Sequence, residues 1–133
     1  MTSELTAAQK ALFDGTNFAA VATINPDGQP QLSVVWCKTD GNDILFSTTI
    51  GRRKQRNLER DPRVTVLINP KDAPYSYVEV RGTATMTEEG ARALIDEFAK
   101  KYTGADRYTA DDGTDNVRVI VRITPERIVT MGI

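Results

Sequence analysis

The feature that most constrains the fold of this chain is a series of short apolar or alternating segments, separated by residues that favour turns. Residues 25–28 (NPDG) and 39–43 (TDGND) lie between the first three segments and have the composition of tight turns. This spacing is typical of antiparallel hairpins. We expect seven strands, over residues 18–24, 31–38, 44–48, 63–68, 75–86, 117–123 and 127–133.

Two details of the later strands bear on how the sheet bends. Residues 75–86 alternate between apolar and polar positions, and Gly82 within them marks a bulge or a tight bend of a closing barrel. Residues 124–126 (TPE) have turn character, so we expect them to separate the last two strands. The first feature predicts a bend in the sheet, and the second predicts a strand end.

Three helices are predicted to cover this sheet. The first follows Ser3 and ends at Asp14-Gly15, and a short basic helix lies between Gly51 and Asp61-Pro62. The third spans residues 87–102 and carries an apolar stripe that would pack on the sheet. The stripe comprises Ala91, Leu94, Ile95, Phe98 and Tyr102.

The fold class that follows is α+β, mainly β, with an antiparallel barrel of about six or seven strands under helical covers. A meander of this many strands must close or cover its edges. Side chains fill a barrel of this size, so ligand sites fall outside it or at a subunit boundary. The polar segment 103–116 is long enough to be either a mobile loop or a lid over a site.

Composition sets the broad class of the protein. A chain of 133 residues with 40% hydrophobic and 26% charged residues is expected to form one globular domain over residues 1–133. No signal-peptide pattern and no apolar stretch of 18 residues occurs, so we expect a cytoplasmic protein without a membrane partner. With no histidine and one cysteine, Cys37, neither a Ser-His-Asp enzyme nor a transition-metal site is expected.

Positive charge gathers at one predicted strand-to-helix junction. Residues 52–63 hold six basic and two acidic side chains, a local charge of +4 in a chain whose net charge is −1. The junction follows three hydroxyl residues at 47–49, and helix N-terminal amides add further donors there. These groups favour a phosphate site. The alternative is a solvated helix whose Arg and Lys side chains balance nearby carboxylates.

Two patterns in the chain carry a family resemblance. ATxxxDGxPxxS occupies residues 22–33, and RxKxRNLxRDPR occupies residues 52–63. Together with YSYVEVRGTATM at 75–86, they resemble the split β-barrel family of flavin-type oxidoreductases related to pyridoxamine 5'-phosphate oxidase, and most closely its branch that uses the deazaflavin coenzyme F420. The similarity extends from the first helix to the final strand.

The resemblance implies a set of cofactor-binding residues. The hydroxyl segment and the basic helix would hold the phosphate and tail of the cofactor, the second strand would line its ring, and two tyrosines from a second subunit would cover the site. The residues concerned are Gln31, Ser33, Val35, Ser47, Thr48, Thr49, Ile50, Arg52, Arg53, Lys54, Arg56, Asn57, Tyr75 and Tyr77. Trp36 and Cys37 are interpreted as core or barrel-wall residues instead.

The implied activity is hydride transfer from reduced F420 (F420H2) to a small electrophilic organic acceptor. A bound cofactor would carry this reaction, which suits a chain without histidine. The alternatives are an FMN-dependent or haem-degrading relative and an F420-binding protein without turnover. Vitamin B6 synthesis is not expected, because the family's C-terminal Arg-x-His signature is missing from this sequence.

The expected partner is a second copy of the chain, since the family forms homodimers with cofactor sites at the interface. Nucleic acid is not an expected partner, because the basic segment lacks interleaved aromatic residues and the rest of the chain is acidic.

Overall fold

The computed structural model describes residues 3–133. This part of the chain forms three helices, α1 (Ala7–Asp14), α2 (Arg53–Arg60) and α3 (Ala91–Thr103). The strands are β1 (Ala19–Ile24), β2 (Pro30–Val35), β3 (Cys37–Asp40), β4 (Asp43–Thr49), β5 (Arg63–Ile68), β6 (Tyr77–Thr87) and β7 (Arg118–Met131).

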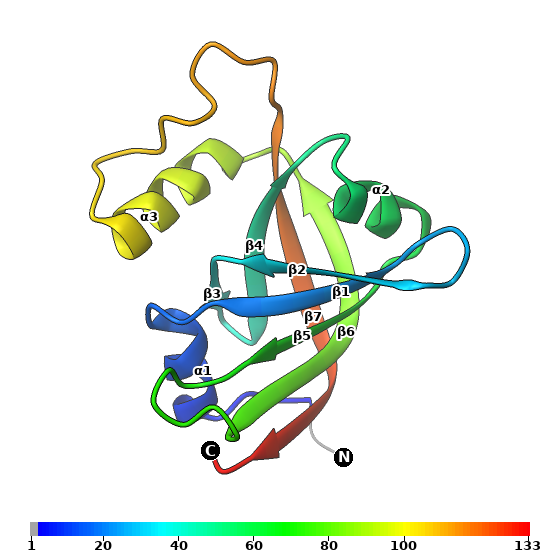
Figure 1. The fold of residues 1–133 in the computed structure, drawn as a ribbon, viewed down its shortest axis with the longest axis vertical. Coiled ribbons are helices and arrows are strands. Elements are labelled where there is room, and N and C mark those ends of the chain that lie inside the picture. Colours follow the sequence, from blue (N-terminus) through cyan, green and yellow to red (C-terminus); the bar gives the residue numbers. More distant parts are fainter. Residues whose placement is uncertain (1–2) are drawn as a thin grey trace.

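The seven strands form one antiparallel sheet in the order β2-β1-β5-β6-β7-β4-β3. The sheet curls into a half-barrel, with α1 and α2 at opposite ends and α3 on its outer side (Figure 1). Its two edge strands, β2 and β3, are consecutive in the chain and only Trp36 separates them. The predicted α+β fold with a split antiparallel barrel is confirmed.

The prediction of one strand over residues 31–38 is wrong, because the chain changes partners at Trp36. Before this residue β2 pairs with β1, with Val35 opposite Ala19. After it β3 pairs with β4, with Cys37 opposite Phe46. A run of apolar residues does not reveal that its two halves belong to opposite edges of a curled sheet.

The predicted turn at residues 124–126 is also wrong, since β7 continues through it as one strand. The pairing of β6 with β7 shifts register between Arg81 and Gly82, which confirms the bulge predicted at Gly82. A Cβ atom on Gly82 would lie 2.2 Å from the carbonyl oxygen of Thr124, so only glycine permits this close approach. The strands therefore bend at this point without ending.

Two helices begin later than predicted. Helix α1 is capped by Thr6 rather than Ser3: the Thr6 hydroxyl accepts from the Gln9 amide, and the Gln9 side chain accepts from the Thr6 amide. Helix α3 begins at Ala91 because β6 extends to Thr87 and Gly90, at φ 77°, makes the turn between them. The apolar stripe of α3 is buried, apart from Tyr102, which is partly buried.

The core lies inside the half-barrel, where alternate residues of the strands meet; Phe46, Val66, Val80 and Ile123 are examples. A second cluster forms outside the barrel, where Leu94, Ile95 and Phe98 of α3 pack on Leu45 of β4. Trp36, Tyr102 and Tyr108 flank this outer cluster. The side of β4 under α3 is therefore apolar at one end, and the site described below lies beside it.

In residues 3–133, no helix has the length and apolar character needed to cross a membrane. The cytoplasmic location stays a prediction.

Candidate functional site

The basic junction follows β4 directly. Gly51, at φ 98°, makes the turn that β4 needs to reach α2, a conformation that favours glycine. The Gln55 side chain accepts a hydrogen bond from the Gly51 amide at 2.9 Å, and the Arg52 amide donates to the Thr49 carbonyl at 3.2 Å. Arg52 occupies the N-cap position without a side-chain capping bond. The turn therefore places Arg52 and Lys54 next to the outer face of β4.

A cavity of about 330 Å³ lies between this junction, β2 and α3. One side is apolar and aromatic and the other is basic. The lining residues are Phe18, Val34, Val35, Trp36, Ser47, Arg52, Lys54, Ile95, Phe98, Tyr108 and Arg118.

Phe18 and Trp36, on the aromatic side of the cavity, belong to a column of three stacked rings. Tyr102 stands in the middle, with its ring centroid 5.5 Å from that of Phe18 and 5.3 Å from that of Trp36. The rings of Trp36 and Tyr102 are nearly parallel, at 8°. Tyr108 meets Trp36 edge to face at 6.2 Å. This side is suited to a flat, conjugated molecule.

The basic side brings together cations from two elements that are distant in the sequence. Lys54 and Arg52 come from the junction, and Arg118 comes from the start of β7, with its guanidinium 3.5 Å from the Ser47 hydroxyl. Burial lowers the pKa of Lys54, and the positive charges of Arg52 and Arg118 lower it further. A bound anion would relieve this repulsion, so the electrostatics favour a phosphate or carboxylate ligand here.

Arg118 is the most buried of these cations and has a carboxylate partner. Its Nε donates to Asp111 at 2.7 Å, and the two side chains are only 8% and 7% exposed. The same guanidinium lies 4.9 Å from the ring centroid of Tyr108 and donates to its hydroxyl at 3.3 Å. The hydrogen bonds from Arg118 are the main reason that the pKa of Asp111 is lowered.

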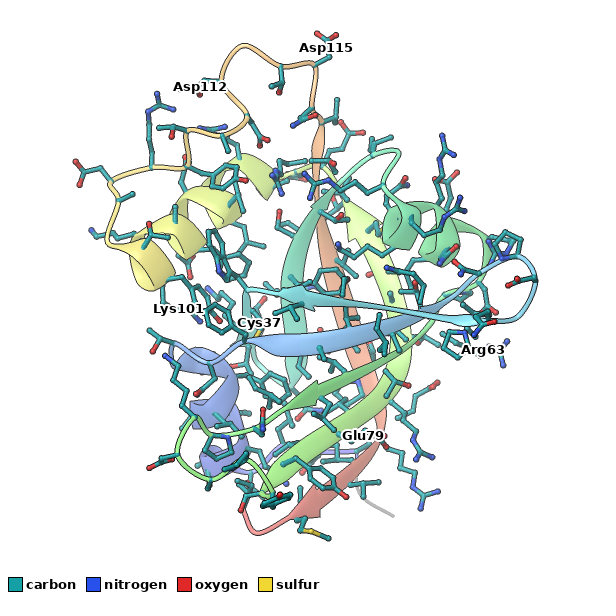
Figure 2. The ribbon with its side chains drawn as sticks, viewed as in Figure 1. Cys37, Arg63, Glu79, Lys101, Asp112 and Asp115 are labelled. Atoms are coloured by element: carbon teal, nitrogen blue, oxygen red, sulfur yellow. The ribbon has the colours of Figure 1, made fainter. Side chains whose placement is uncertain are left out.

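The polar segment after α3 was predicted to be either mobile or a lid, and in the structure it lies against the cavity. The Tyr108 amide donates to Asp96 of α3 at 2.8 Å, and Arg92 of α3 donates to the Tyr108 carbonyl at 2.6 Å. These bonds hold the Tyr108 ring at the cavity wall. The outer part of the segment, with Asp112 and Asp115, projects away from the barrel (Figure 2).

Four of the residues that the resemblance singled out line the cavity: Val35, Ser47, Arg52 and Lys54. Thr49 lies on the same face of β4 as Ser47, where it pairs with Arg118. Thr48 faces the barrel interior, fully buried, while Ile50, Arg53 and Arg56 are exposed around the junction.

The remaining predicted residues lie elsewhere in a single chain. Gln31 and Ser33 alternate with exposed residues on β2 and face the same side as Val35, but they do not line the cavity. The Asn57 side chain is fully buried beneath α2. Tyr75 and Tyr77 lie around the start of β6, at the end of the barrel away from α2 (Figure 1). Neither tyrosine lines the cavity.

Sequence reasoning did not select the other lining residues, namely Phe18, Val34, Trp36, Ile95, Phe98, Tyr108 and Arg118. Trp36 was interpreted as a core or barrel-wall residue rather than a cofactor contact, but the structure places it between β2 and β3, where it lines the cavity. Arg118 reaches the cavity because the pairing of β4 with β7 places it opposite Thr49. That register depends on the fold and was not readable from local patterns.

Cys37 lies behind the aromatic column in the core. Its thiol is fully buried, and burial raises its pKa to about 11. The Lys101 ammonium donates to the Cys37 carbonyl and lies 4.6 Å from the ring centroid of Tyr102 (Figure 2). The Tyr102 hydroxyl donates to the Asn17 carbonyl at 2.7 Å. These contacts fix the column and leave the thiol in its neutral form at pH 7.

The residues present fit a flavin-type cofactor. A basic group with a hydroxyl suits a phosphate, and the aromatic side suits a planar ring. In residues 3–133, two buried hydroxyls, of Ser33 and Thr48, have no hydrogen-bond partner. Ser33 lies on β2 next to the cavity wall residues Val34 and Val35, but it does not line the cavity itself.

Comparison with known proteins agrees with this assignment of class. The fold defines a split-barrel protein (Figure 1). The family model described as pyridoxamine 5'-phosphate oxidase matches residues 5–132, and the chain belongs to this family. A pyridoxine/pyridoxamine 5'-phosphate oxidase of Rubrobacter xylanophilus is 38% identical over 74 residues, which are 55% of this chain and 34% of that protein. The chain therefore spans about a third of this relative.

Solved structures give a fuller overlap. A protein described as an F420 reductase is 28% identical and has a TM-score of 0.82, covering 94% of this chain and 98% of that one. The conserved hypothetical protein Rv2991 of Mycobacterium tuberculosis is also 28% identical, with a TM-score of 0.77, covering 98% and 87%. HupZ of Group A Streptococcus, at 18% identity and a TM-score of 0.71 over 96% and 94%, shares the fold.

Proposed function

We propose that the protein is an oxidoreductase that uses F420H2 to reduce a small electrophilic organic acceptor. The observation that carries the proposal is the division of one cavity into a basic half, with Ser47, Arg52, Lys54 and Arg118, and an aromatic half next to β2. A cofactor with a phosphate and a flat ring requires both halves. The overall similarity to an F420 reductase supports the choice of this cofactor.

The chain's own residues would bind and orient the cofactor. Arg52 and Lys54 would hold the phosphate, with the Ser47 hydroxyl as a further donor. Val35 and Trp36 would form the surface on which the ring lies, and Tyr108 would exclude water from one side. When bound, the deazaflavin supplies the hydride. The protein's contribution is to bring two planar molecules together and keep the site dry.

An FMN-dependent oxidoreductase is the second candidate, because the matched family is that of pyridoxamine 5'-phosphate oxidase. FMN ends in one phosphate, which Ser47, Arg52 and Lys54 could bind without help from the outer cations of α2. A non-catalytic F420-binding protein would need the same phosphate site. Binding data separate the two cofactors, and turnover data separate an enzyme from a binding protein.

The proposal includes a homodimer in the cytoplasm. The outer face of β2 and β5 exposes apolar side chains, with Leu32 at 69%, Val34 at 70% and Leu67 at 36%. Val34 and Leu67 lie in one row, since both pair with Ala20 of β1. An apolar row of this kind favours a self-complementary interface, across which a partner's tyrosines would complete the site. Sedimentation that gives only a 14.7 kDa monomer at micromolar concentration would contradict this part.

The deciding experiment is a fluorescence titration of the purified protein with F420 and with FMN, followed by stopped-flow oxidation of F420H2 with electrophilic acceptors. We expect F420 to bind more tightly and F420H2 to be oxidised faster with protein than without it. Equal or tighter FMN binding, or a yellow protein on purification, would favour the second candidate. Tight F420 binding without turnover would indicate a binding protein.

A further inference from the structure

Helix α2 and its N-cap residue carry the cavity cations Lys54 and Arg52, and few interactions within the helix stabilise it. It has eight residues, four of them Arg or Lys, and its N-cap residue Arg52 makes no side-chain capping bond. Isolated helices of this length are not stable in water. Its only buried apolar residue is Leu58, and the other buried side chains are Gln55 and Asn57. The position of α2 therefore depends on a few buried contacts.

Asn57 makes the most extensive of these contacts. Its side chain is fully buried. The amide nitrogen donates to the Thr23 hydroxyl at 3.0 Å and to the Asn25 side-chain oxygen at 2.9 Å. The amide oxygen accepts from the Arg60 guanidinium at 3.4 Å. Both ends of the Asn57 amide are thus engaged within the protein, and neither is directed to the cavity.

The bonds of Asn57 connect α2 to the two strands at the edge of the half-barrel. Thr23, itself only 1% exposed, donates its hydroxyl proton to the Gln31 side chain at 3.1 Å. Thr23 lies on β1 and Gln31 on β2, where the two residues are paired. A continuous chain of hydrogen bonds therefore runs from α2 through β1 to β2, the strand that contributes Val34 and Val35 to the cavity.

We propose that Asn57 is a positioning residue that fixes α2 on the hairpin of β1 and β2 and so places Lys54 and Arg52 at the cavity. Lys54 lies three residues before Asn57, less than one helical turn away, so movement of α2 at Asn57 moves Lys54 as well. Asn57 acts through the cations and does not touch the ligand. The consequence for ligand binding rests on the proposed cofactor site, whereas the anchoring of α2 does not.

The test uses two variants that break the same hydrogen bond from opposite sides. Asn57→Ala removes the amide, and Thr23→Val removes the hydroxyl while keeping the shape of the side chain. Asn42→Ala is the matched control. The Asn42 side chain accepts a hydrogen bond from the Leu5 backbone amide and donates one to the Ser3 carbonyl, in the segment before α1. Thr23→Val also keeps the proposal testable if Asn57→Ala does not fold.

The first measurement is hydrogen exchange of backbone amides in the free protein. We expect the amides of α2 to exchange about tenfold faster in Asn57→Ala and in Thr23→Val, with β6 and β7 unchanged. Asn42→Ala leaves α2 protected as in the wild type. Unchanged protection of α2 in both test variants overturns the proposal. This arm requires no cofactor, so it decides the anchoring even if the wild type does not bind F420 and the proposed function fails.

The second measurement is the dissociation constant of F420 in a double-mutant cycle with Lys54→Ala. We expect Asn57→Ala to weaken binding about tenfold in the wild-type background and less than threefold in the Lys54→Ala background, because the two residues act as one unit. A full tenfold loss in both backgrounds would mean that Asn57 contacts the ligand independently, and would overturn the positioning role.

Discussion

Basic side chains lie both at the cavity and on the exposed outer side of β5 and β6. The two regions differ in how these side chains are paired with carboxylates. On the outer side, Arg63 donates to Asp61 at 2.8 Å and Arg81 donates to Glu79 at 2.8 Å, and Arg63 and Glu79 lie away from α3 (Figure 2). The bonds from Arg63 hold the pKa of Asp61 at about 2. At the cavity, neither Arg52 nor Lys54 has a salt bridge to any carboxylate in residues 3–133.

The difference shows which positive charges are available to a ligand. A helix whose cations only balanced nearby carboxylates would resemble the outer side, where each arginine named above has an acidic neighbour. The cavity instead leaves Arg52 and Lys54 without an acidic partner among residues 3–133, and burial lowers the pKa of Lys54. Such an arrangement costs stability in the free protein, which a bound anion would restore.

The largest expected effect is that of Lys54→Ala on cofactor binding. Loss of a charge-assisted hydrogen bond to phosphate should weaken F420 binding by about 1.5–3 kcal/mol, with the fold intact. The control is Arg122→Ala, because Arg122 is paired with Asp40 and Asp43 at 2.8 and 3.0 Å outside the cavity. Fluorescence titration measures both variants. Equal dissociation constants for Lys54→Ala and the wild type would contradict the role of the unpaired cavity cations in ligand binding.

Arg118 is the cavity cation that does have a partner, and its bond to Asp111 can be broken separately. Asp111→Asn should lower the free energy of unfolding by about 2 kcal/mol, because it leaves a buried guanidinium without its charge partner. Since the pKa of Asp111 is lowered in the folded state, its contribution is present at neutral pH and is lost as the pH falls below the usual carboxyl value of 3.8.

Urea unfolding at pH 7 and at pH 3 tests this assignment. The difference between wild type and Asp111→Asn should be large at pH 7 and shrink at pH 3. A difference that is the same at both values would show that the charge of Asp111 does not stabilise the loop. Asp112→Asn is the control, since its bond to Arg107 is exposed and should contribute little.

The lowered pKa of Lys54 predicts a pH dependence of cofactor binding. The pKa of Lys54 is lower than the usual lysine value of 10.5. As the pH rises, the affinity for F420 should therefore begin to fall before the pH reaches that value. The loss should amount to roughly 1 kcal/mol per pH unit once the lysine titrates. Titrations between pH 7 and 10 check this, with Lys54→Ala as the control that should show no such decline. A constant wild-type affinity would contradict the role of Lys54.

The smallest expected effect concerns the exposed cations of α2, Arg53 and Arg56. They would meet the carboxylates of the oligoglutamate tail of F420, at about 0–1 kcal/mol each, and salt should screen them. The preference for polyglutamylated F420 over FMN should therefore be greatest at low salt and shrink as ionic strength rises. If this preference does not change with salt, the contacts that distinguish F420 from FMN lie inside the cavity and not at Arg53 and Arg56.

Local patterns in the sequence located most of the strands and all three helices. The turn residues at 25–28 and 39–43 and the alternation in residues 75–86 depend on backbone preferences that neighbouring residues decide among themselves. The break at Trp36 and the continuous β7 were missed for one reason. Whether a strand changes partner or bends depends on residues that pair with it from far away, such as Gly82 opposite Pro125.

The residues of the candidate site also fall into two groups: those that local sequence predicted and those that only the fold brings together. The basic half was predictable, because Ser47, Arg52 and Lys54 lie within eight consecutive residues and a glycine turn brings them to one spot. Arg118 joins them only because β7 pairs with β4 in one particular register, and the column of Phe18, Trp36 and Tyr102 joins three separate segments of the chain. The sequence by itself determined the strand and helix content and where the positive charge gathers, since these depend on local chemistry. Only the tertiary structure decided which cations are paired and which face the cavity, because pairing depends on distances between residues that the chain order does not fix.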